Sequence, residues 1–176
     1  MFQLKESKVL IASVNARAEK HGDKTEPAFD LTCEVNCAST VLDMFDKELR
    51  TTLYKKNDEP DLVDQADPEA LTALRFPRVD ALKWDLDLTG YRLRVAYGIG
   101  GPSDIQLPDC KVDGFKFKAQ QGGTVSVRFR VIAHPKTEDV GRLCEMIQQT
   151  IEMDIVAPEP TTVAQLFGDD QKKKAA

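Results

Sequence analysis

The stretch that decides the fold is GGTVSVRFRVIAHP, residues 122–135, in which apolar and polar side chains alternate. One phase is apolar from Val125 to Val131, and the other phase carries Arg128 and Arg130. Successive side chains of a strand point to opposite faces, so this alternation predicts a β-strand with one face in a core and the other in solvent. It also raises the question of why two arginines would lie on the outer face of a protein whose formal net charge is −5.

The same period of two recurs along most of the chain. It predicts further strands at residues 8–15, 28–38, 81–88, 89–98, 110–119 and 150–156. In residues 81–88 the apolar phase includes Trp84, which we expect in the core. Val112 and Phe115 cannot share one face of a regular strand, so we expect a β-bulge at Gly114. Residues 120–123 then form the turn into the strand quoted above.

Two segments change to the helical period. Residues 39–56 and 136–149 carry apolar side chains at helical spacing, with Thr40 and Thr137 as the expected N-caps. Residues 16–28 are expected to form a polar hairpin or loop, and residues 57–70 an acidic surface loop. These patterns predict a β-rich α+β fold over residues 1–158: a single bent antiparallel sheet, a barrel or a sandwich, with two short helices. Residues 159–176 are rich in proline and charge, which predicts a disordered tail.

The overall composition is that of an ordinary globular domain. A length of 176 residues suits one domain, and the 41% hydrophobic and 30% charged content excludes a mostly disordered chain. The charged N-terminal segment resembles neither a signal peptide nor an anchor, and no stretch approaches the ~20 apolar residues that span a bilayer. We therefore expect a cytoplasmic protein with no membrane partner. The negative net charge argues against indiscriminate coating of DNA, although a local basic patch can still bind it.

The sequence contains no catalytic signature. His21 and His134 lie outside any nucleophile or zinc motif. The glycine-rich stretch YGIGGPSD, residues 97–104, lacks the lysine and hydroxyl residue of a P-loop, so we expect a turn there. Asp85 and Asp87 would lie about 7 Å apart on one strand face, with no third acidic ligand at nuclease-like spacing. We therefore predict that the protein is not an enzyme, with no catalytic residue, metal or cofactor.

The four cysteines are interpreted as small, reduced, buried side chains. Cys33 and Cys37 share one face of a predicted strand, which places their Cα atoms about 13 Å apart, too far to bind one metal ion. Cys110 and Cys144 are isolated in the sequence and are interpreted in the same way.

Basic side chains occur in pairs on the outer phase of three consecutive predicted strands. The six residues are Arg92, Arg94, Lys116, Lys118, Arg128 and Arg130. If consecutive strands are neighbours, the pairs form one stripe, and because like charges on adjacent strands repel, a stripe favours an anionic partner such as a phosphate chain. The alternative is that strands with acidic outer residues, such as Glu34 and Asp154, lie between the basic ones and neutralise them. The aromatic residues of these strands fall in the inner phase, so the stripe would hold a backbone rather than stack on bases.

Three segments of the chain resemble a family of phage proteins. They are RAEKHGDKTEPAFDL (17–31), LRVAYGIGGPSDIQLPDCKVDGFKFKAQQGGTVSVRFRV (93–131) and GRLCEMIQQTIEMDIVAPEP (141–160). Over about residues 2–160 the chain is similar to small early proteins of tailed phages and prophages that are encoded near recombination and replication genes. The resemblance implies a protein of the host cytoplasm with a role in DNA metabolism or host takeover, and it assigns no functional residue.

Two functions fit these observations. The first is an accessory protein of phage recombination or replication that binds single-stranded DNA through the basic stripe. The second is an inhibitor that binds a host defence or DNA-repair complex, for which the acidic loop 57–70 is a suitable DNA mimic. In the tail, Leu166 and Phe167 form an apolar pair that predicts a site for binding a partner protein. Whether the partner is DNA or a host or phage protein, and whether the chain forms a homo-oligomer, stays open.

Overall fold

The computed structural model describes residues 1–58 and 70–159. Its strands are β1 (Leu4–His21), β2 (Lys24–Ala38), β3 (Tyr54–Lys55), β4 (Ala73–Leu74), β5 (Leu82–Trp84), β6 (Leu88–Val95), β7 (Ile105–Gln120), β8 (Thr124–Ala133) and β9 (Thr150–Val156). Its helices are the 3₁₀-helices η1 (Ser39–Met44) and η2 (Gly101–Ser103) and the α-helices α1 (Leu49–Leu53) and α3 (Thr137–Glu145). None of these helices is long and apolar enough to cross a membrane.

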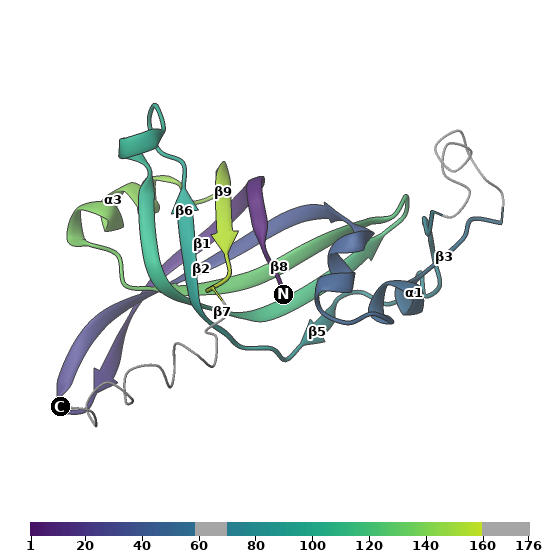
Figure 1. Cartoon of the computed structure of the whole chain (residues 1–176), viewed down its shortest axis with the longest axis horizontal. Helices are drawn as coiled ribbons and strands as arrows, with labels where there is room; N and C mark the ends of the chain where they lie inside the picture. Colours follow the sequence, from purple (N-terminus) through teal and green to yellow (C-terminus); the bar gives the residue numbers. More distant parts are fainter. Residues whose placement is uncertain (59–69, 160–176) are drawn as a thin grey trace, which may run out of the picture.

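Within the described residues, six strands close into an antiparallel β-barrel (Figure 1). The order around the barrel is β7-β6-β9-β1-β2-β8, and β8 pairs again with β7. The last strand, β9, lies between β1 and β6, so the first and last strands of the described chain are neighbours in the sheet. The predicted β-rich α+β fold is confirmed, and among the three architectures left open it is the barrel.

The strand β7 bends so that its two halves pair with different neighbours. Its first half pairs with β6, and its second half pairs with the short strand β5. Between the halves the register with β8 shifts at Asp113–Lys116, where Gly114 has a φ of 65°. The predicted bulge at Gly114 is confirmed, and a glycine suits it because a left-handed φ is strained for residues with a Cβ atom.

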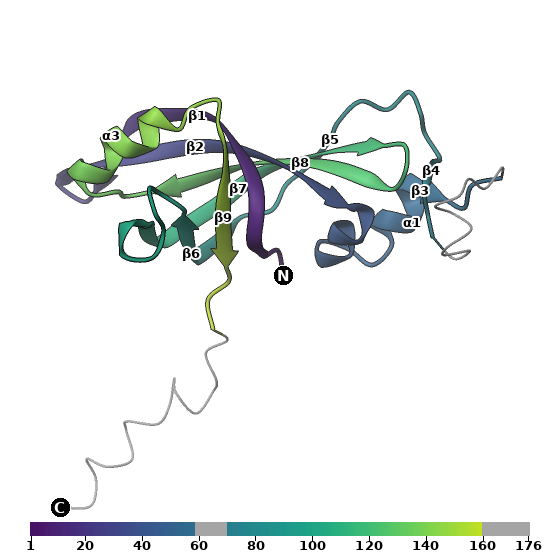
Figure 2. The same cartoon turned by 90° about the horizontal axis from the view of Figure 1, so that it is seen from above.

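Apolar side chains fill the inside of the barrel, as expected when six to eight strands close. The inward residues of the 122–135 stretch, Val125, Val127, Phe129 and Val131, are all buried, as predicted. At one end η1 brings Phe45 onto Phe2, Phe115 and Phe117, with ring centroids 4.7–5.4 Å apart. At the other end lies α3 (Figure 2), which buries Leu143.

The helix predicted over residues 39–56 is confirmed only in part, because the chain forms the two short helices η1 and α1 and then enters β3. Tertiary contacts of Tyr54 explain the early end: its hydroxyl group donates to the carbonyl oxygen of Thr124 (2.5 Å) and accepts from the amide of Gln120 (3.1 Å). Neither expected cap is correct. The N-caps are Ala38 and Lys136, and neither helix has a side-chain capping bond.

Of the two alternatives predicted for residues 16–28, a polar hairpin or a loop, the hairpin is confirmed: these residues form the outer part of the long β1–β2 hairpin. Strands β1 and β2 remain paired out to His21 and Lys24, with a turn at Gly22 and Asp23. Because β9 and β8 pair only with the inner parts of β1 and β2, the hairpin projects beyond the barrel as a two-stranded ribbon (Figure 1).

Two predictions about buried side chains need correction. Cys33 and Cys110 are buried and Cys37 is half-buried, but Cys144 is exposed, because α3 turns Leu143 and Met146 inward and residue 144 outward. Trp84 has the predicted inward phase but is only partly buried, since β5 lies at the edge of the sheet. The tail with Leu166 and Phe167, and most of the acidic loop 57–70, lie outside the described residues.

Candidate nucleic-acid interface

The three strands with basic pairs are neighbours, as predicted, but acidic side chains engage one arginine on β6. Arg94 donates hydrogen bonds to Asp104 (2.9 Å), to Glu152 (3.2 Å) and to Asp154. Hydrogen bonding to Asp154, then to Asp104 and Glu152, raises the pKa of the Arg94 guanidinium, and Arg94 in turn lowers the pKa of Asp104 and of Asp154. Arg94 therefore joins β6 to β9 and has few donors left for a ligand.

Arg130 of β8 is engaged in the same way, on the same side of the bulge as Arg94. Its guanidinium donates two hydrogen bonds to Asp113 (2.7 and 2.9 Å) and lies 3.6 Å from Asp30. Burial alone would raise the pKa of Asp113, but the hydrogen bond and charge of Arg130, helped by Lys111, outweigh it and lower that pKa. The pair is therefore ionised and holds β7 against β8.

Arg92 is separate from the basic residues of β7 and β8. It lies opposite Val156 of β9, on the half of the barrel where β6 pairs with β9. Lys116 and Lys118 lie beyond the bulge, where β7 pairs with β5 and β8 instead. The six predicted residues thus do not form one continuous stripe. Lys116, Lys118 and Arg128 come together, whereas Arg92, Arg94 and Arg130 lie elsewhere.

A lysine that the sequence analysis did not single out completes the cluster. Lys83 of β5 lies directly opposite Lys116 of β7, and Lys116 lies directly opposite Arg128 of β8. All three side chains are exposed, and none forms an ion pair or hydrogen bond with the described residues. We call these three residues the basic row. The alternation of residues 81–88 already placed Lys83 outside, but its position beside Lys116 depends on strand pairing.

The basic row borders an open hollow on the outside of the barrel. Lys116, Lys118, Ser126 and Arg128 line this hollow of about 360 Å³ together with Glu34, Asp80 and Ala81. Asp80 lies 2.9 Å from the Lys118 ammonium, and Glu34, which is directly opposite Arg128 on β2, accepts a hydrogen bond from Ser126 (2.8 Å) that leaves its negative charge in place. Among the described residues, Lys83 and Lys116 are therefore the members of the basic row with the least compensated charge.

The side chains of this surface suit the binding of anions. Lysine and arginine supply hydrogen-bond donors and positive charge, the groups that proteins use to hold phosphates. Among residues 1–58 and 70–159, no group of three histidine, cysteine, aspartate or glutamate side chains is placed to hold a metal ion. Comparisons of the chain with models of protein families, with curated proteins and with solved structures find no match.

Proposed function

We propose that the protein is a non-enzymatic accessory of DNA recombination or replication that binds single-stranded nucleic acid through the basic row and Lys118. The observation that supports this proposal is the register of Lys83, Lys116 and Arg128 on three adjacent strands. We further propose that it acts in the cytoplasm of an infected host, as the resemblance to early phage proteins implies.

Like charges in direct register need a compensating partner. Side chains directly opposite on antiparallel strands lie about 5 Å apart, and like charges at that distance destabilise the sheet. None of the three residues of the basic row forms an ion pair with the described residues, although Glu34 of β2 lies directly opposite Arg128 in register and offsets part of its charge. A phosphate chain lying along the row, which spans about 10 Å across the strands, would offset this repulsion and release counterions.

Salt dependence gives the proposal a numerical form. Each phosphate contact on a single strand contributes about −0.7 to the slope of log affinity against log salt. Four contacts, by the basic row and Lys118, predict a slope of about −2.8. Raising the salt from ~50 to ~200 mM should then weaken binding about 50-fold.

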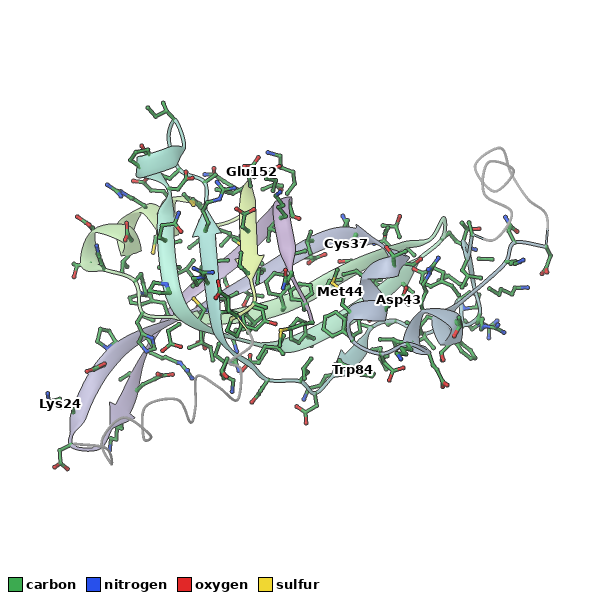
Figure 3. The ribbon with its side chains drawn as sticks, in the orientation of Figure 1. Lys24, Cys37, Asp43, Met44, Trp84 and Glu152 are labelled. Carbon is green, nitrogen blue, oxygen red and sulfur yellow. The ribbon has the colours of Figure 1, made fainter. Side chains whose placement is uncertain are left out.

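Two charge-matched variants test the proposal by fluorescence anisotropy with a labelled oligothymidylate. The first variant is Lys83→Gln/Lys116→Gln, which leaves two contacts and should flatten the slope to about −1.4. The control is Lys20→Gln/Lys24→Gln, which also removes two positive charges, but from exposed positions on the β1–β2 ribbon. Lys24 lies at the tip of that ribbon, at the other side of the molecule from Trp84 in β5 (Figure 3).

The control should keep the wild-type slope. Equal losses in both variants would mean that binding depends on the overall charge and not on the basic row. No binding by the wild type at low salt would overturn the proposal. In that case, a host protein that is captured in stoichiometric amount both with and without nuclease treatment would favour the inhibitor function.

A further inference from the structure

A second surface feature, beside the hollow, is a tight turn that exposes an aromatic ring. Residues 76–79 form a β-turn in which the amide of Val79 donates to the carbonyl oxygen of Phe76 (3.1 Å), and Pro77 occupies the second position. Phe76 and Val79 are each 52% exposed. For a phenylalanine this is unusual, since large apolar side chains are among those most often buried.

Neighbouring contacts hold the turn in place. The side chain of Arg75 donates to the carbonyl oxygens of Thr51 (2.8 Å) and Tyr54 (3.1 Å), and its backbone amide donates to Leu53 (2.9 Å). Arg75 is therefore a structural residue that anchors the turn to α1 and β3. Phe76 is presented from a fixed position and not from a free loop.

The turn lies at the edge of the basic hollow. Asp80, directly after the turn, lines the hollow and also lines a small apolar depression together with Phe76 and Val79. That depression holds only about 10 Å³, too small for a base or a side chain to enter. Leu82 and Phe117, which belong to the inner phase of β5 and β7, also line this depression, so Phe76 lies across the β5 edge from the outward-facing basic row. A strand that packs against the Phe76 ring and binds the basic row would pass over this edge at Asp80.

We propose that Phe76 is a base-stacking platform for the single strand whose phosphates bind the basic row. This inference rests on the proposed function and adds how bases are engaged. Positive charge that follows the backbone, combined with exposed aromatic rings, is how proteins bind single strands without reading sequence. The aromatic residues of the barrel strands point inward, so the ring comes from the turn before β5 instead. Because stacking requires an unpaired base, the interface should prefer single strands to duplex DNA.

Two oligonucleotides with the same number of phosphates separate stacking from charge. One is an oligothymidylate, and the other is an abasic strand of equal length. The wild type should bind the oligothymidylate more tightly, by about 5- to 150-fold for one stacked base. Phe76→Ala should remove this preference and leave both the salt slope and the affinity for the abasic strand unchanged. Phe76→Tyr, which keeps an aromatic ring, should restore it.

Val79→Ala is the matched control, because Val79 has the same exposure in the same turn. It should keep the preference for bases. If Phe76→Ala keeps the preference while Lys83→Gln/Lys116→Gln flattens the slope, stacking is overturned and the proposed function stands. If the wild type binds the two strands and a polyglutamate chain equally well, the surface is a general anion site suited to acidic proteins, and stacking is again overturned. If nothing binds, both proposals fail.

Discussion

Replacing Asp113 with asparagine tests whether Arg130 serves the fold and not a ligand. The Asp113 side chain is 5% exposed, accepts two hydrogen bonds from Arg130 and lies 3.5 Å from the Lys111 ammonium. The amide in Asp113→Asn has nearly the same shape but carries no charge and has only one acceptor oxygen. The substitution therefore removes the ion pair and at least one hydrogen bond without opening a cavity.

The size of the effect follows from the burial of the two partners. Removing one partner of a fully buried ion pair costs about 3–5 kcal/mol, and hydrogen bonds to charged groups contribute about 1.5–3 kcal/mol. Arg130 is 42% exposed, so water can solvate it again after the substitution. We therefore expect a loss near the lower end, about 2 kcal/mol, which corresponds to a fall in Tm of about 4–8 °C for a chain of this size.

The loss should also depend on pH. Because the pKa of Asp113 is lower in the folded protein than in the unfolded chain, its stabilisation is complete at neutral pH and disappears as the pH falls through the folded value. Urea unfolding at neutral pH should show the full difference between wild type and variant. The difference should shrink once the pH falls below about 4.

Asp80→Asn is the control for this measurement, since Asp80 pairs with Lys118 but its side chain is 83% exposed. Its effect on the free energy of unfolding should be within about 0.5 kcal/mol. Equal effects of the two substitutions, or an undiminished effect of Asp113→Asn in acid, would refute the conclusion that a buried ion pair stabilises the fold here.

Three further predictions concern the interface, the bulge and the cysteines. Asp80→Asn frees Lys118 and should raise the affinity for the oligothymidylate several-fold, and an unchanged affinity would show that Lys118 makes no phosphate contact. Gly114→Ala should lower the free energy of unfolding by about 1–2 kcal/mol, because residue 114 has a left-handed φ. Gly141→Ala, in α3 with open space around it, should raise the free energy of unfolding by about 0.5–1 kcal/mol. Chemical denaturation that finds the Gly114 variant more stable than the Gly141 variant would contradict both. Under native conditions the exposed Cys144 should react with a thiol reagent and Cys33 should not, because Cys33 is buried and its pKa is raised to about 12. Peptide mapping that finds Cys33 labelled before Cys144 would be inconsistent with this fold.

The features that follow from the sequence alone are those set by local geometry. Side chains alternate along any strand, so the inner and outer faces of residues 122–135 could be assigned without knowing their neighbours. The bulge at Gly114 was predicted for the same reason, since the phase of the apolar residues changes there. The barrel was one of three architectures compatible with such strands. The candidate site was predicted in part, with Lys116, Lys118 and Arg128 on the outer face.

Only the tertiary structure decided which outer residues meet. Arg94 is neutralised because β9, from the far end of the chain, lies beside β6. Lys83 joins Lys116 because the bend of β7 frees its second half for β5. Register between strands depends on long-range packing, which local alternation does not encode. The basic and aromatic residues of RFPR, 75–78, were a signal that could have pointed to the turn, but whether Phe76 is exposed or buried depends on how the barrel and Arg75 hold it.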